Sequence, residues 1–139
     1  MSKSGENLWP EFNFREIETP LSILQEQAQK LGERTKNVLV GEVNVTEAFD
    51  EDSREIVLIY QFFVKAPALS NYRRLLFRLL QRGVSYPVDI YFDPTQDKFN
   101  NISQVAFPEI LKKIFQDEKT KEIINSLYAN SIQFKPNLK

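Results

Sequence analysis

The sequence contains no cysteine and no histidine. Without cysteine there is no disulfide, thiol nucleophile, iron–sulfur cluster or thiolate zinc site. Without histidine there is no imidazole to act as the base of a Ser/His/Asp triad, or as a nitrogen ligand for zinc, copper or iron. We therefore expect no metal centre, no bound cofactor and no catalytic activity.

Glycines and long apolar runs are also scarce. The four glycines, at positions 5, 32, 41 and 83, are too scattered to form either common glycine-rich phosphate loop. No uncharged apolar run approaches the roughly 20 residues that cross a bilayer. The first residues lack the apolar core of a secretory signal. These absences predict a cytoplasmic protein without a membrane segment.

The composition is that of a folded domain of ordinary size. The chain has 139 residues, of which 42% are hydrophobic, including eleven Phe and five Tyr, so one core is readily filled. Lys and Arg number 18 against 19 Asp and Glu, which gives a net charge of -1 and no strong overall attraction to nucleic acid. We expect a single domain over residues 1–139.

Three segments have the pattern of amphipathic helices. Thr19 and Pro20 are suited to the cap and first position of a helix that ends near Gly32. Near the end of the chain, Pro108 suits the first turn of a second helix, and Asp117 suits the cap of a third. Apolar residues recur at three- and four-residue steps in each segment.

Three other segments have the pattern of strands. Residues 37–49 and 54–65 are rich in β-branched and aromatic side chains and flank a charged turn, which predicts a hairpin whose second strand is central. Residues 86–92 predict a further short strand, and residues 95–103 are expected to be a polar loop.

Residues 69–82 fit two structures. As a helix, the segment places its leucines on one side and its arginines on the other. As a strand, it leaves Leu76 and Leu80 among the arginines on the polar face. The period therefore favours a helix, with a strand as the alternative.

Together these elements predict an α+β fold, with a small antiparallel sheet of three to four strands that packs against an N-terminal helix and two C-terminal helices. The nearly continuous apolar run of residues 57–64 indicates a strand covered on both faces. Because one chain of this length has few helices to cover both faces, a homodimer is a possible arrangement.

The two ends are expected to differ from the centre. Residues 1–18 predict an arm or a short strand. Its three aromatics, Trp9, Phe12 and Phe14, either pin the segment to the core of the chain or bind a partner, and we favour the first. Residues 133–139 predict a frayed tail.

Charge is distributed unevenly along the chain. Residues 65–84 contain basic residues but no acid, whereas acids dominate residues 35–64. The basic segment has three interpretations: pairing with the acids of residues 47–55 or solvation, binding to an acidic protein partner, and contact with nucleic-acid phosphates. The candidate partner-binding residues are Arg73, Arg74, Arg78 and Arg82, with Trp9 and Phe12 of the arm.

Carboxylates are the only remaining route to catalysis. The acids of residues 47–55 and Asp89 have no calcium-loop spacing and precede no strand-borne Glu-x-Lys, so a charged turn is the simpler interpretation. We expect a non-catalytic protein-interaction or regulatory protein that binds an acidic partner of unknown identity through its arginine-rich segment. The alternatives are a divalent-metal nuclease or phosphodiesterase, and a nucleic-acid accessory protein.

Overall fold

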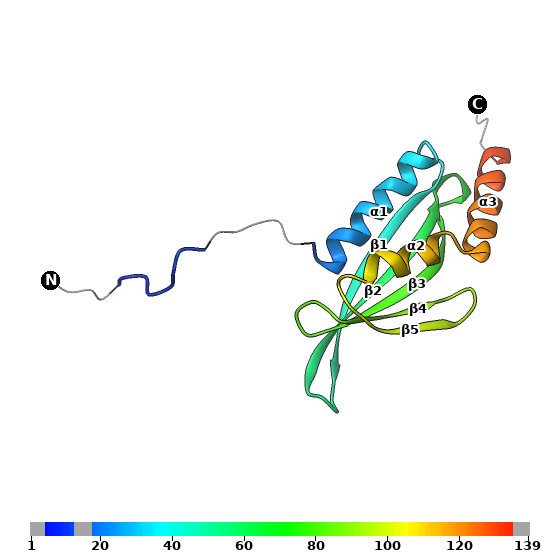
Figure 1. Cartoon of the computed structure of the whole chain (residues 1–139). Coiled ribbons are helices and arrows are strands. Elements are labelled where there is room, and N and C mark those ends of the chain that lie inside the picture. The colour runs from blue at the N-terminus through cyan, green and yellow to red at the C-terminus, as the bar shows by residue number, and fades with distance from the viewer. Residues whose placement is uncertain (1–4, 13–17, 135–139) are drawn as a thin grey trace.

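The computed structural model of the chain describes residues 5–12 and 18–134. Five strands form one antiparallel sheet in the order β1-β2-β3-β4-β5, so each strand pairs with its neighbours in sequence. Helices pack against this sheet (Figure 1). The elements are α1 (Pro20–Arg34), β1 (Val40–Asp50), β2 (Glu55–Ala66), η1 (Pro67–Leu69), β3 (Tyr72–Arg82), β4 (Val88–Phe92), β5 (Asp97–Ile102), α2 (Phe107–Phe115) and α3 (Glu118–Gln133).

This architecture confirms the α+β class, the N-terminal helix, the two C-terminal helices and the hairpin of β1 and β2. The predicted number of strands, three to four, is wrong, because the sheet has five. Two segments account for the difference. Residues 69–82, for which we favoured a helix, begin with the last residue of η1 and contain the whole of β3, and residues 95–103, expected to be a loop, contain β5.

A β-bulge explains why β3 has a helix-like sequence period. Leu75 and Phe77 of β3 pair with the adjacent residues Phe63 and Phe62 of β2, so Leu76 has no register partner. One extra residue shifts the in–out alternation of a strand by one position. Leu76 consequently enters the core, where it is only 1% exposed.

Leu80, the other residue that argued against a strand, lies on the face of the sheet away from the core. It is half-buried there opposite Ile59 of β2, which is also half-buried. Pairing along nearly the whole of β2 stabilises β3 as a strand, since tertiary pairing overrides a local helical period.

The sequence of β5 reads as a loop because β5 is an edge strand. It pairs only with β4, and Ile102 is its one fully buried residue. Its register with β4 shifts between Val88 and Ile90, and Asn101 has a positive φ of 59°. Short, polar and irregular strands are typical of sheet edges, where they discourage pairing with other chains.

The helix starts follow the predicted caps. Thr19 and Ser22 form a reciprocal capping box at α1, and the Asp117 carboxylate accepts a hydrogen bond from the Lys119 amide at the start of α3. Pro108 lies in the first turn of α2. Side chains that accept from otherwise unpaired amides stabilise a helix start by about 1 kcal/mol.

The core lies between one face of the sheet and the three α-helices. Phe62 and Phe77 stack at its centre with their ring centroids 5.1 Å apart, and the ring of Phe115 lies 5.6 Å from that of Phe62. The helices contribute four fully buried side chains to the same cluster: Leu24, Phe107, Leu111 and Ile114. One contiguous core therefore joins all the helices to the same face.

A close approach and a buried hydroxyl fix α1 on β1. A Cβ atom added at Gly41 would lie 2.6 Å from the Cα atom of Ala28, so only glycine admits the helix at this distance. The Thr35 hydroxyl donates to the Leu39 carbonyl at 2.8 Å and accepts from the Leu39 amide at 3.1 Å. These contacts place α1 over β1, whereas α3 contacts β2 and η1 on the same face of the sheet.

The two ends of the described chain differ from each other. Residues 5–12 contain no strand, and Leu8, Trp9 and Phe12 are 89%, 74% and 56% exposed. Our prediction that the aromatics pin this arm to the core is therefore wrong for Trp9 and Phe12, and Phe14 lies outside the described residues. At the other end, Gln133 is the last residue of α3, and the rest of the predicted tail beyond residue 134 lies outside the described residues.

Candidate functional site: the open face of the sheet

The candidate site is the face of the sheet opposite the helices, which we call the open face. Tyr60 and Phe62 enter the core, so Gln61 between them points the other way and shares its face with its register partner Arg78. The register assigns these residues to the open face: Glu42, Asn44, Thr46, Ala48, Val57, Ile59, Gln61, Phe63, Lys65, Arg73, Leu75, Arg78, Leu80, Arg82, Asp89, Tyr91 and Lys98.

Arg73 forms an internal cluster at one end of the open face. Its Nη1 atom lies 2.9 Å from Oε2 of Glu42, and its guanidinium carbon lies 4.2 Å from the ring centroid of Phe63. The Nζ atom of Lys65 is 3.8 Å from the other oxygen of Glu42. One carboxylate thus serves two cations, and the guanidinium covers Phe63, which is only 9% exposed.

Arg82 forms a second internal pair at the other end of β3. Its Nη1 atom lies 3.0 Å from Oδ2 of Asp89 on the neighbouring strand β4. The other oxygen of Asp89 accepts a hydrogen bond of 2.8 Å from the Asn101 amide of β5. Asp89 therefore ties three strands together, and this role accounts for it without a metal ion.

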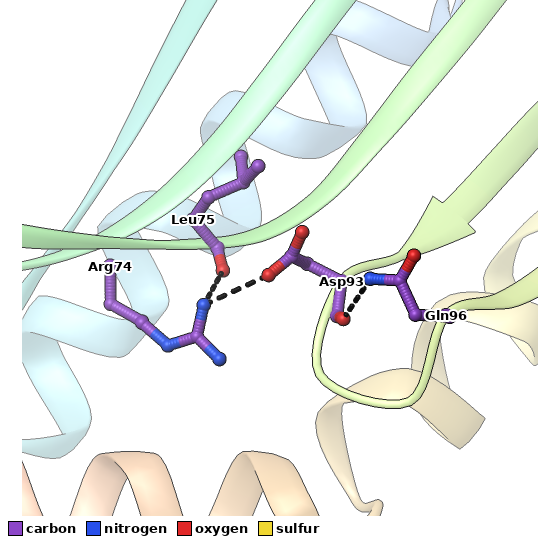
Figure 2. Close-up of polar contacts among 4 residues, drawn as sticks. All are labelled: Arg74, Leu75, Asp93 and Gln96. Atoms are coloured by element: carbon purple, nitrogen blue, oxygen red, sulfur yellow. Dashed lines mark hydrogen bonds and ion pairs between the residues drawn. The ribbon is translucent and has the colours of Figure 1, made fainter.

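Arg74 lies on the helix side of the sheet and not on the open face, because its register partner is the core residue Val64. Its Nη1 atom donates to Oδ2 of Asp93 at 2.9 Å and to the Leu75 carbonyl at 3.2 Å (Figure 2). The Asp93 carbonyl in turn accepts from the side-chain amide of Gln96. Arg74 thereby holds the turn between β4 and β5 against β3.

Arg78 differs from the other three arginines. Its guanidinium carbon lies 5.9 Å from the ring centroid of Tyr91, and Nζ of Lys98 on β5 lies 5.6 Å from the same centroid. Within residues 5–12 and 18–134, neither cation has a carboxylate within ion-pair distance. Both border a hollow of about 350 Å³ whose lining also includes Ile59, Leu80 and Asp93, and the Asp93 carboxylate is paired with Arg74.

Below the open face, a polar pair in the core supports the end of β3. The Tyr60 hydroxyl donates to Oε1 of Gln81 at 2.7 Å, and Nε2 of Gln81 donates to the Val84 carbonyl at 2.8 Å. Burial raises the pKa of Tyr60 above its ordinary value of 10.0. Burial also raises the pKa of Tyr86, and the nearby Glu18 and Tyr60 act in the same direction.

The structure thus divides the predicted cluster of arginines. Arg73, Arg74 and Arg82 each meet a carboxylate of the same chain, but the partners are Glu42, Asp93 and Asp89 and not the acids of residues 47–55. Of these four arginines, only Arg78 has no ion pair with a carboxylate of the described residues. Trp9 and Phe12 belong to the arm and lie outside the open face.

Sequence reasoning missed Lys98 and Tyr91 as members of this site. Tyr91 was assigned to a strand without a function, and Lys98 lay in the expected loop. The hairpin of β4 and β5 is the signal that identifies them. Its loop has four residues, Asp93 to Gln96, and this length places Tyr91 of β4 opposite Lys98 of β5.

The acidic turn between β1 and β2 is organised by its own hydrogen bonds. The Asp50 carboxylate accepts from the Asp52 amide and from the Ser53 hydroxyl, both at 3.1 Å. Among the residues that the structure describes, no group of three or more Asp, Glu, His or Cys side chains is arranged to hold a metal ion.

None of the described helices is long and apolar enough to cross a membrane. Comparison with protein-family models, curated proteins and solved structures finds no match to this chain. The interpretation of the open face consequently depends on its geometry and charge.

Proposed function

We propose that this chain is a non-catalytic protein-interaction or regulatory protein that binds an acidic segment of a partner protein on the open face. Arg78 and Lys98 supply the charge, and Tyr91, Ile59 and Leu80 supply apolar contact. The observation that carries the proposal is that Arg78 and Lys98, beside Tyr91, have no carboxylate of the described residues within ion-pair distance, since Asp93, which also lines the hollow, is paired with Arg74.

The contrast with the neighbouring arginines supports this choice of residues. Arg73 and Arg82 already hold Glu42 and Asp89, so a ligand carboxylate would have to displace an internal partner. Arg78 and Lys98 require no such exchange. An arginine guanidinium binds a carboxylate through two parallel N–H···O bonds, and the cation–π contact with Tyr91 orients the group without using those donors.

The surroundings favour a protein segment as the ligand over a free small anion. The hollow is lined by the half-buried apolar side chains of Ile59 and Leu80, and half-buried Leu75 lies further along β3 on the same face. Exposed apolar area bordered by charge is typical of protein-binding surfaces. A segment that alternates acidic and apolar residues would place its carboxylates at the cations and its apolar side chains on these residues.

A binding experiment with a defined probe tests the proposal. The probe is a fluorescent peptide of about ten residues, the length of two short strands, in which Glu and Leu alternate. We expect fluorescence anisotropy to show binding at low salt. The variant with Arg78→Glu and Lys98→Glu should bind at least about a hundredfold more weakly, because two favourable charge pairs become repulsive.

Two controls make the result specific. A variant with Lys113→Glu and Lys121→Glu makes the same change in net charge at exposed positions of α2 and α3 that line neither hollow of the helical side, and it should bind as the wild type does. A peptide with Gln in place of Glu should bind weakly. Equal loss in both double variants would contradict the proposed site.

A single-stranded oligonucleotide of similar length separates the nucleic-acid alternative from a protein partner. Tighter binding of the oligonucleotide, with an affinity that falls steeply as salt rises, would replace the protein partner by nucleic acid. Circular dichroism of each variant confirms that the fold is retained.

A further inference from the structure

A second candidate binding surface lies on the helical side of the molecule, in the groove between α1 and the pair α2 and α3. The groove contains two adjoining hollows of about 400 Å³ and 310 Å³. They share Gln27 and Arg34 of α1, together with Phe115 and Gln116 at the end of α2. We call this surface the helical groove.

The helical groove has an apolar floor and a basic rim. Leu31, Phe115 and Ile124 contribute apolar walls, while Lys30, Arg34 and Lys112 line its edges. Over the described chain, no Asp or Glu lines either hollow. The groove therefore suits an occupant that combines bulky apolar side chains with carboxylates.

The N-terminal arm has these complementary properties. Leu8, Trp9 and Phe12 are all more than half exposed, and the rings of Trp9 and Phe12 lie 6.4 Å apart. Glu6 and Glu11 are interspersed with these apolar residues. Large apolar side chains grouped on a surface mark a contact site, and this group carries the charge opposite to that of the groove.

The arm lies apart from the body of its own chain in Figure 1, with its apolar side chains exposed. We propose that the arm of a second copy fills the helical groove, and that two chains exchange arms reciprocally to form a symmetric homodimer. In this dimer the arm of each copy fills the groove of the other, so no arm or groove is left to bind a third chain. The open face stays free, and the inference is independent of the function proposed above.

The size of the contact is consistent with a stable dimer. A buried aromatic side chain removes about 150–250 Å² from water. Two aromatics and one leucine from each arm give roughly 1,000 Å² for the two arms, and the grooves bury a comparable area. The total lies near the upper end of the roughly 1,200–2,000 Å² of stable protein–protein interfaces.

Trp9 provides a direct probe, because it is the only tryptophan in the sequence. We expect sedimentation to show a monomer–dimer equilibrium in the full chain between about 1 µM and 1 mM, the range of moderate affinities. Trp9 emission should shift to shorter wavelength as dimer forms. Replacing Phe12 by Ala should weaken the dimer on the order of tenfold.

A charge exchange supplies the decisive test. One variant carries Glu6→Lys and Glu11→Lys in the arm, and the other carries Arg34→Glu and Lys112→Glu in the groove. Each variant alone places like charges together and should remain monomeric. An equimolar mixture restores both arm–groove pairs and should form heterodimers, with Trp9 emission returning to that of the wild-type dimer.

The matched control is Arg78→Glu on the open face, which should leave dimerisation unchanged. Three results would overturn the inference: a wild-type monomer with fully exposed Trp9 at the highest concentration, a mixture of variants that stays monomeric, or Trp9 buried in a monomer. The last result would place the arm in the groove of its own chain. All the exchanged residues are exposed, so a folding failure is not expected.

Discussion

The two faces of the sheet differ in what covers them and in what their arginines do. The core face is covered by three α-helices and contains the stacked pair of Phe62 and Phe77. The open face mixes apolar side chains with five cations, most of them held by carboxylates of the same chain. One face therefore stabilises the fold, while the other leaves a region around Arg78 where the cations have no carboxylate partner in the described residues.

The largest expected effect is a difference in how much the free energy of unfolding falls when a large side chain is removed from each face. Phe77→Ala removes a fully buried ring from the core, so we expect the free energy of unfolding to fall by about 3–5 kcal/mol. Leu80→Ala on the open face should cost only about 1 kcal/mol, because Leu80 is half-buried. Urea denaturation of both variants measures the difference, and equal losses would contradict the assignment of the two faces.

A second prediction concerns how the helices reach the core face. Gly41→Ala forces a Cβ atom against Ala28 and should lower the free energy of unfolding by about 1–3 kcal/mol. Thr46→Ala, an exposed change on the open face of the same strand, should stay within about 0.5 kcal/mol of the wild type. A stable Gly41→Ala protein would mean that α1 packs less closely on β1 than the structure shows.

The smallest effect is a dependence of stability on pH. The raised pKa of Tyr60 means that the folded chain keeps this proton above pH 10.0, where unfolded tyrosine loses it. The corresponding stability is present below that pH and is lost as the pH rises further. Tyr60→Phe should flatten this decline and, by leaving Gln81 Oε1 without its donor, lower stability by about 1–3 kcal/mol at neutral pH. If the melting temperature of Tyr60→Phe fell with rising pH as steeply as that of the wild type, this prediction would be contradicted.

Local signals in the sequence predicted much of the fold. Thr19 and Asp117 cap helices where their side chains can accept from backbone amides, and the hairpin of β1 and β2 follows from two apolar runs around a charged turn. These features depend on neighbouring residues only. For that reason they could be recognised without the tertiary structure.

The errors came from features that depend on distant partners. The bulge at Leu76 is created by pairing with β2, and without it the segment has a helical period. The polar strand β5 is held by β4, so its own composition does not identify it.

The same limit applies to the candidate site. The basic segment was visible in the sequence, but the sequence did not show which of the four arginines within the eleven residues of β3 are paired and which is unpaired. That distinction required their carboxylate partners to be known. Arg74 proved to lie on the helix side, and Lys98 joined Arg78 only through the pairing of β4 with β5. Spacing in the sequence indicates charge density, whereas the sheet register determines which charges remain available.

Titration of the isotope-labelled protein with the alternating Glu and Leu peptide, followed by NMR, tests the central claim most directly. The account predicts that the amide signals that move first belong to the centre of the open face, at Arg78, Leu80, Tyr91 and Lys98. Signals from α1 and α2 should stay in place. Shifts confined to the helical side, or no shift at millimolar peptide and low salt, would contradict the claim that the open face is the binding surface.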